Sequence, residues 1–244
     1  MAIAPKKLQE NLQRIRENIA AACAKARRDP SAVTLVAVTK TADLDDIKNL
    51  IELGVGELGE GRVQQLTERQ GQLQEWLSRR RKETSAVRWH MIGHLQRNKV
   101  KQVLQSAQVI HSIDSLRLAE EIDARAAALN VVPDVMLEVN CSQEEQKFGV
   151  AVGASMHLAE QMATLKNLRV VGLMAMAPLS EDPEAARPTF VRMRELFEDM
   201  LAERIGGKTF RHLSMGMSQD YGVAIEEGAT MIRVGRALFG EGQA

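Results

Sequence analysis

The chain has 244 residues, of which 45% are hydrophobic, and this is enough to enclose one large core. Lys plus Arg and Asp plus Glu number 32 each, so the formal net charge is zero. A neutral chain has no basic field for nucleic acid or an anionic membrane, which favours a small molecule as partner. No apolar run approaches the roughly 20 residues of a membrane-spanning helix. Cys23 and Cys141 form no C-x-x-C pair, so we expect free thiols, no metal site and a cytoplasmic protein.

The first predicted element is a long amphipathic helix over residues 8–26. Leu8, Leu12, Ile15 and Ile19 recur in it at helical spacing, and Asp29-Pro30 ends it. The next run, 34–38, is continuously apolar and β-branched, which is typical of a strand covered on both faces. Further strands are predicted at 57–58, 88–92, 109–113, 134–139, 170–174, 210–213 and 231–234. Helical patterns lie between them, for example at 45–53, 114–128, 153–165, 184–201 and 219–227.

Eight strands that alternate with helices indicate a parallel sheet. We therefore predict a single α/β domain over 1–244, a (β/α)8 barrel of the TIM type with an additional N-terminal helix. An open doubly wound sheet of six strands would also fit the alternation if two of the strands are absent. Residues 70–85 are rich in Gln, Glu and Arg, and we predict that they form a solvated helical insertion.

Three motifs resemble known sites but lack the required context. Residues 54–59 match G-x-G-x-x-G, yet they follow a helix rather than leaving a strand, so Gly54 is interpreted as a helix cap. Residues 216–220 begin like a nucleophile elbow but lack its second glycine. His90 and His94 are four residues apart, but a predicted strand and Gly93 separate them. We expect neither a dinucleotide site, nor a hydrolase, nor a metal site.

In a β/α barrel the reactive groups gather at the carboxyl ends of the strands. The first strand ends in Val38-Thr39-Lys40, which places an amine directly after an apolar run. Desolvation there would favour the neutral, nucleophilic amine that forms Schiff bases. Lys40 is therefore a candidate for covalent binding of an aldehyde, although a lysine that simply opens a solvated loop is the ordinary alternative.

The seventh and eighth predicted strands end in loops that suit a phosphate group. Ser214, Gly216 and Ser218 lie just before a helix, and two hydroxyls, a glycine and free helix N–H groups favour a dianion. Ordinary serine capping with a glycine turn is the alternative. Gly235 follows the eighth strand, and Arg233 on that strand would point into the barrel mouth.

Six motifs in order give the chain a resemblance to a known family. They are Ala37-Val-Thr-Lys40, residues 90–99, Lys147-Phe-Gly149, residues 172–176, residues 214–220, and Arg233-Val-Gly235 with Leu238-Phe-Gly240. Nearly the whole chain resembles the pyridoxal 5′-phosphate (PLP) homeostasis proteins, which are single-domain relatives of alanine racemase. The resemblance implies a TIM-type barrel preceded by a long helix, with PLP attached to Lys40 as an aldimine.

The resemblance also implies a set of cofactor-binding residues. Phosphate contacts map onto Ser214, Met217, Ser218 and Gly235, and an arginine beside the pyridine ring maps onto Arg233. Asn140 and Met174 would border the cofactor. The full predicted set is Lys40, Asn140, Met174, Ser214, Gly216, Met217, Ser218, Arg233, Gly235 and Arg236, with no catalytic residue.

Two departures from the family pattern affect that set. Gly61 stands where the family usually has asparagine after Gly-Glu, which removes a polar side chain from that position. Arg236 replaces a small hydroxyl residue, so its guanidinium would either bind phosphate or turn outward.

The function implied is a monomeric protein that carries or buffers PLP for apo PLP-dependent enzymes and so affects the balance of amino and keto acids. The alternatives are a PLP-dependent amino-acid racemase or lyase and a regulatory scaffold that does not use PLP. Related racemases use a tyrosine supplied across a dimer interface by a second domain. This chain offers only Tyr221 and no second domain, so we expect no efficient racemisation.

Overall fold

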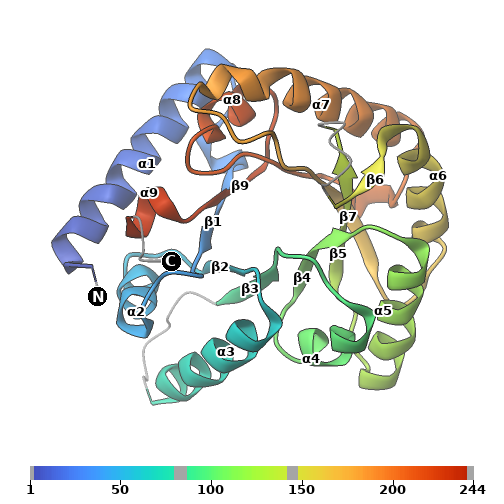
Figure 1. Cartoon of the computed structure of the whole chain (residues 1–244), viewed down its shortest axis with the longest axis horizontal. Helices are drawn as coiled ribbons and strands as arrows, with labels where there is room; N and C mark the ends of the chain where they lie inside the picture. Colours follow the sequence, from blue (N-terminus) through green and yellow to red (C-terminus); the bar gives the residue numbers. More distant parts are fainter. Residues whose placement is uncertain (1–2, 80–86, 142–147, 241–244) are drawn as a thin grey trace.

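A closed parallel barrel forms the centre of the computed structural model, which describes residues 3–79, 87–141 and 148–240 (Figure 1). β4 pairs with β5 and β9 pairs with β1, which completes the ring and excludes the open sheet. A two-residue strand, β6 (Val150–Ala151), pairs in parallel with the carboxyl end of β5. The barrel strands are β1 (Thr34–Val38), β2 (Glu57–Glu60), β3 (Arg88–Met91), β4 (Val109–Ile113), β5 (Asp134–Asn140), β7 (Arg169–Met174), β8 (His212–Ser214) and β9 (Met231–Val234).

Helices surround the barrel on its outer face (Figure 1). The α-helices of the described ranges are α1 (Pro5–Lys25), α2 (Leu44–Glu52), α3 (Val63–Ser78), α4 (Val100–Leu104), α5 (Leu116–Leu129), α6 (Val152–Ala163), α7 (Arg187–Ala202), α8 (Tyr221–Glu226) and α9 (Arg236–Phe239). Short 3₁₀ turns lie at η1 (Pro30–Ala32), η2 (Arg97–Lys99), η3 (Pro183–Ala186) and η4 (Gly207–Thr209). None of the helices in these ranges is long and apolar enough to cross a membrane.

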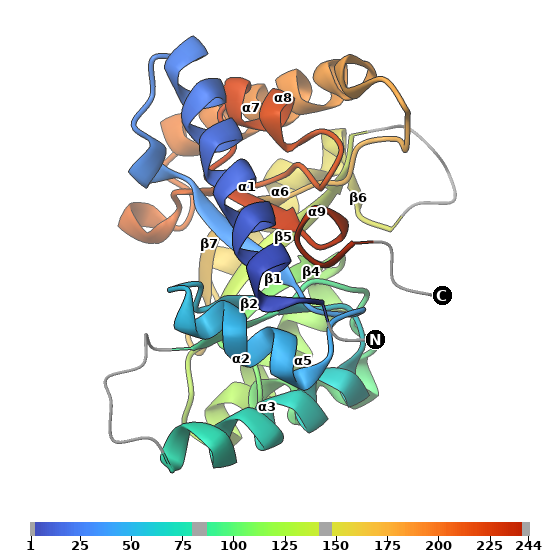
Figure 2. The same ribbon diagram turned by 90° about the vertical axis from the view of Figure 1, so that its left-hand side faces the viewer.

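The additional helix α1 packs along α8 and α9 (Figure 2). Its buried residues Leu8, Leu12 and Ile15 follow the helical spacing that predicted it. Asn11 Nδ2 donates to Leu238 O at 2.8 Å, and Asn18 Nδ2 donates to the hydroxyl of a residue in α8 at 2.9 Å. The first helix of the chain therefore supports the two helices that follow β8 and β9.

Residues 70–78 are helical and mostly exposed, as predicted, but they are not an insertion. They form the second half of α3, the regular helix between β2 and β3, on which Val63, Leu66 and Leu73 are buried. The exposed face of α3 is rich in Gln and Glu, so these three apolar residues gave only a weak periodic signal. Residues 80–86 lie outside the described ranges.

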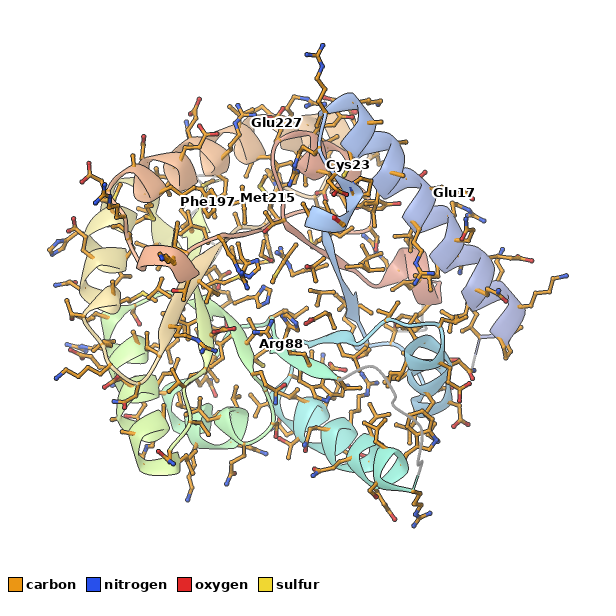
Figure 3. All side chains as sticks on the ribbon, turned by 180° about the vertical axis from the view of Figure 1, so that it is seen from behind. Glu17, Cys23, Arg88, Phe197, Met215 and Glu227 are labelled. Carbon is orange, nitrogen blue, oxygen red and sulfur yellow. The ribbon has the colours of Figure 1, made fainter. Side chains whose placement is uncertain are left out.

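The seventh predicted strand is displaced by two residues, because β8 begins at His212 rather than at Phe210. Phe210 N donates to Gly207 O in η4, and the Phe210 ring stacks on Phe197 of α7 with centroids 5.1 Å apart. Figure 3 shows Phe197 on α7. The following helix likewise begins at Tyr221 rather than at Gln219, since Tyr221 N donates to Met217 O and closes a turn first.

Two kinds of side chain fill the inside of the barrel. Val109, Met136, Val171, Met174 and Met231 form a small apolar cluster separate from the main core. They come from β4, β5, β7 and β9, and only the interior lets strands that are not neighbours share one cluster. Ionisable and polar residues occupy other inward positions. They are Glu57, Arg88, His90, His111, Asp134, Glu138, Ser214 and Arg233, and most of them are buried.

Candidate functional site

Lys40 lies where the sequence predicts it, two residues beyond the carboxyl end of β1. Its neighbour Thr39 is fully buried, whereas Lys40 itself is exposed. The expectation that the apolar run buries the amine is therefore wrong, because the burial ends one residue earlier. The amine stands at the mouth of the barrel, accessible to a small molecule.

A buried ion pair fixes the backbone on both sides of Lys40. Arg69 of α3 donates to Thr39 O and to Ala42 O, the latter at 2.8 Å, and it also pairs with the carboxylate of Glu60. Glu60 is fully buried at the end of β2 and accepts a second hydrogen bond from Thr39 Oγ1. Neither charged residue is in the predicted site, although a buried carboxylate at the end of a strand requires a partner.

The loop after β8 makes a turn that only glycine fits. Gly216 has φ +89°, and a Cβ added there would lie 2.5 Å from Ala224 Cβ and 2.9 Å from Tyr221 Cα. Gly216 O accepts a hydrogen bond from Arg233 N at 3.0 Å, which ties the loop to β9. The β8–α8 loop is thus held close to both its own helix and the neighbouring strand.

The β8–α8 and β9–α9 loops meet at one hydroxyl. Ser218 Oγ accepts hydrogen bonds from Gly235 N at 3.3 Å and from Ala237 N at 3.2 Å. A Cβ added to Gly235 would lie 3.1 Å from Val38 O, so this glycine packs closely against the end of β1. The two loops that the sequence predicts to share a phosphate therefore lie side by side, next to the strand that leads to Lys40.

Two other members of the predicted phosphate set already have partners. Met217 N donates to Asp220 Oδ1 at 2.5 Å, so this amide caps the turn before α8. Arg236 is exposed, and its Nη2 donates to Gln219 Oε1 at 3.1 Å across the two loops. The guanidinium of Arg236 is therefore held next to the two loops by Gln219 and does not turn away from them.

Arg233 lies in the barrel interior and is almost fully buried. Its Nη1 donates to Ser214 Oγ at 2.6 Å and its Nη2 donates to Ala175 O at 2.9 Å. Burial lowers the pKa of Arg233 to about 10, against the opposing charges of Glu138 and Asp220, and the guanidinium remains a cation at neutral pH. Ser214 is also fully buried, so its side chain belongs to the interior.

A continuous chain of hydrogen bonds extends from Arg233 to the opposite end of the barrel. Ser214 Oγ lies 3.0 Å from His111 Nδ1, and His111 Nε2 lies 2.8 Å from His90 Nδ1. His90 Nε2 then lies 2.5 Å from Glu57 Oε2, at the first residue of β2. Glu57 and His111 lie in predicted strands but are not in the predicted site, and His90 was considered only as a metal ligand and rejected.

The charges at its two ends fix the direction of this chain. Burial favours the neutral acid of Glu57, but the hydrogen bond from His90 and the nearby Arg88 outweigh it and lower the pKa of Glu57. Burial lowers the pKa of His90, although the hydrogen bond and charge of Glu57 act in the opposite direction. Burial also lowers the pKa of His111 well below the usual value. Neutral His90 must therefore donate to Glu57 and accept from His111, which accepts from the Ser214 hydroxyl.

Burial raises the pKa of Glu138, also on the barrel interior, to about 7. Asp114 adds to this effect, while the charge of Arg233 opposes it. Because Glu138 lies two residues before the end of β5, it adds a group that changes charge near neutral pH to the same end of the barrel as Arg233.

The remaining predicted residues are less directly connected. Asn140 is half-buried at the end of β5, where it pairs with β6, and Met174 is almost fully buried in the interior apolar cluster. His90 points into the barrel, whereas the His94 ring stacks on Phe148 with centroids 4.2 Å apart, so the two histidines have separate surroundings as predicted. Gly54 has φ +85° after α2, which confirms its interpretation as a helix cap.

These features suit the groups of PLP. An accessible amine suits the aldehyde, the paired glycine loops suit the phosphate, and Arg233 supplies a buried cation in the barrel interior. Bound PLP would supply an electrophilic aldehyde, and a cation beside its pyridine nitrogen would disfavour protonation of that nitrogen. The fold and the site together define a barrel of the alanine racemase class.

Known proteins of similar sequence support this class. The family model described as alanine racemase, N-terminal domain, matches residues 3–243. A pyridoxal phosphate homeostasis protein of Aquifex aeolicus is 40% identical over 232 residues, which are 95% of this chain and 97% of the relative. The chain belongs to the pyridoxal phosphate homeostasis protein family.

Solved structures give the same result for the fold. A crystal structure of an unknown protein from Bifidobacterium adolescentis superposes with a TM-score of 0.90 at 34% identity and covers 98% of both chains. PipY of Synechococcus elongatus with PLP bound gives 0.77 at 31% identity, over 91% of this chain and 100% of that chain. Alanine racemase of Clostridium difficile gives 0.72 at 14% identity, and the match covers 58% of the racemase chain.

Proposed function

We propose that this chain binds PLP at the carboxyl end of its barrel, as a Schiff base with Lys40, and holds it as a cytoplasmic reserve for apo PLP-dependent enzymes. The main support is the junction of the two glycine loops. Ser218 Oγ joins Gly235 N and Ala237 N, and Gly235 packs on Val38, two residues before Lys40. A small molecule bonded to Lys40 at the end of β1 can therefore place its anionic group in these loops.

In this proposal each group has a distinct task. The Ser218 hydroxyl, whose oxygen accepts from Gly235 N and Ala237 N, donates its own proton to the phosphate, and Arg236 adds a positive charge at the rim. Arg69 holds the carbonyl groups on both sides of Lys40 and so limits the positions of the amine. Asn140 and Met174 border the cofactor on the side of β5 and β7.

Storage is favoured over racemisation by the surroundings of the single tyrosine. Tyr221 is buried between α8 and α1, and its hydroxyl accepts a hydrogen bond from Asn18 Nδ2 at 2.9 Å. It cannot act as the second acid or base on a substrate at the mouth. The Arg233 cation also weakens the pyridine ring as an electron sink. We propose a monomer that transfers PLP to acceptor enzymes and thereby affects amino-acid and keto-acid balance.

The test is reductive trapping of the purified protein. Borohydride treatment of the PLP-loaded chain, followed by peptide mass mapping, should label Lys40, and Lys40→Ala should abolish the labelled peptide. Lys101→Ala, a change of an exposed lysine on α4, is the matched control and should leave the labelling intact. A label on another lysine, or none, would overturn the assignment of the site.

Racemase activity is tested separately. Incubation of the loaded protein with L-alanine or D-alanine, followed by chiral chromatography, should show no sustained inversion. Turnover that depends on Lys40 would overturn the proposal of a cofactor reserve and establish the racemase alternative.

A further inference from the structure

A cavity that we call the lower cavity lies at the opposite end of the barrel from Lys40. It has a volume of about 330 Å³ and is bounded by α1, by the start of β1 and by the turn between α2 and β2. Thr34 and Glu57, the first residues of β1 and β2, line it, so it opens at the amino ends of the strands. Lys40 is six residues further along the chain from Thr34, which places the two ends about 20 Å apart.

The cavity offers one charge of each sign. Arg16 lies at its edge, where its Nη2 donates to Leu53 O at 3.1 Å and is held in place. Glu57 also lines the cavity, and its carboxylate is about one-third exposed, accepts from His90 and stays ionised near neutral pH, with a lowered pKa. Arg88, His90 and His212 face the same carboxylate from β3 and β8.

The rest of the wall is largely aliphatic. Ile19 comes from α1, Val33 and Leu35 from the β1 region, and Val55 from the turn after α2. The volume is at the lower end of the range of about 300–1,000 Å³ for small-molecule sites. Glu57 suits an ammonium group, Arg16 suits a carboxylate, and the aliphatic wall suits a short apolar side chain. These three groups together describe an aliphatic α-amino acid.

Glu57 is also the last member of the hydrogen-bonded chain that begins at Arg233. Its Oε2 accepts from His90, which is linked through His111 and Ser214 to the guanidinium. A cation bound to Glu57 competes with His90 for the carboxylate, and each link of a polarised chain depends on the next. Occupancy of the lower cavity is therefore connected to Arg233, the buried cation near the Lys40 end of the barrel.

We propose that the lower cavity is a regulatory site for a zwitterionic aliphatic α-amino acid, and that occupancy of this site is coupled through the hydrogen-bonded chain to the PLP site. The coupling rests on the proposed function, whereas binding to the cavity does not. Because coupling between two sites is reciprocal, it can be measured from either one.

Calorimetric titration of L-valine tests the binding, with PLP-free protein so that the amine cannot react with the cofactor. L-valine should bind saturably, while isobutylamine and isovalerate, which each carry one of its two charges, should bind at least about tenfold more weakly. Glu57→Gln keeps an acceptor for His90 but removes the charge, and Arg16→Ala removes the cation. Each should weaken binding about tenfold or more.

The matched controls for these two variants are Glu17→Gln and Arg14→Ala on α1. Figure 3 shows Glu17 on the outer side of this helix, and both residues are exposed and away from the cavity. They should bind L-valine with the affinity of the unmodified chain. Absence of saturable binding, or equal losses in the controls, would overturn the proposal.

Coupling is measured by repeating the titration after PLP has been fixed to the protein by borohydride, which prevents exchange with the amino acid. The dissociation constant should differ from that of the PLP-free form by about fivefold or more. His111→Phe and, as a second variant with a polar side chain, His111→Gln should bind L-valine but lose this difference. Equal constants in the unmodified chain would overturn the proposal, and an unlabelled Lys40 would instead refute the proposed function.

Discussion

Arg233 donates a hydrogen bond from Nη1 to Ser214 Oγ at 2.6 Å, and the same hydroxyl lies 3.0 Å from His111 Nδ1. A serine hydroxyl has one proton to donate, and the direction of the chain commits that proton to His111. Ser214 is therefore a link between a buried cation and a buried imidazole. Any contribution of its side chain to phosphate binding would require this link to break.

Ser214→Ala should consequently lower the stability of the PLP-free protein. The substitution leaves a guanidinium proton and an imidazole nitrogen without their partner in a buried setting, which costs about 1–3 kcal/mol. Urea denaturation followed by circular dichroism measures the loss. Ser78→Ala, at an exposed position on α3, is the control and should change the free energy of unfolding by less than about 0.5 kcal/mol. An unchanged midpoint for Ser214→Ala would contradict the assigned role.

Ser218→Ala should weaken PLP binding by about 1–3 kcal/mol, the usual contribution of a hydrogen bond to a charged group. The hydroxyl joins the two glycine loops by accepting from Gly235 N and Ala237 N, and it keeps its own proton to donate to the phosphate. Equilibrium dialysis on a Lys40→Ala background isolates this effect, since the covalent bond is then absent. Ser78→Ala, at an exposed position on α3, is the control. Equal affinities in the two variants would show that the phosphate lies elsewhere.

Gly216→Ala should destabilise the fold by about 2 kcal/mol or more, because the residue combines φ +89° with a contact of 2.5 Å between the added Cβ and Ala224. Gly222→Ala in α8 is a matched control, since a Cβ there meets nothing within 4 Å. Alanine should be neutral or slightly stabilising at that helical position. Thermal unfolding of both variants gives the comparison, and similar losses in the two would contradict the close packing of the β8–α8 loop.

Glu138→Gln should change the pH dependence of stability. The folded-state pKa of Glu138 is raised from 4.5 to about 7, so the native state binds the proton more tightly than the unfolded state. The resulting stabilisation is complete below about pH 4.5 and is lost as the pH rises through about 7, by up to about 3 kcal/mol. The histidines with lowered pKa values change stability in the opposite direction. The quantity to measure is therefore the difference in the free energy of unfolding between the unmodified chain and Glu138→Gln.

Urea denaturation of the unmodified chain and of Glu138→Gln at about pH 5 and about pH 7.5 gives that difference. The unmodified chain should lose stability relative to the variant as the pH increases. A difference that stays constant between the two pH values would show that Glu138 is already ionised in the folded protein at pH 5.

The strand pattern was predictable because several barrel strands contain a short run of apolar, often β-branched residues. The bounds of β1, β4 and β9 agree with the sequence prediction residue for residue. α3 was partly missed, since three apolar residues on a helix rich in Gln and Glu give a weak periodic signal. The start of β8 was misplaced because Phe210 contributes to the outer core and not to the sheet.

The site was predictable to the extent that it depends on chain order. Lys40, Gly216 and Gly235 follow strand ends, and the closed barrel brings those ends together. The interior chain was not predictable, because His111 and Glu57 acquire their roles only from neighbours more than 30 residues away or on other strands. A signal existed, since a histidine at the centre of the buried strand VIHSI needs a polar partner.

The pairing of β1 with β9, with α1 resting on α8 and α9, joins residues 5–38 to residues 221–239. During synthesis the early segments leave the ribosome long before their partners, so β1 presents an unsatisfied row of amide and carbonyl groups until β9 has been made. A nascent chain that has not reached β9 therefore has a sheet edge that can pair with other chains, and a protein released before residue 231 would retain that hazard.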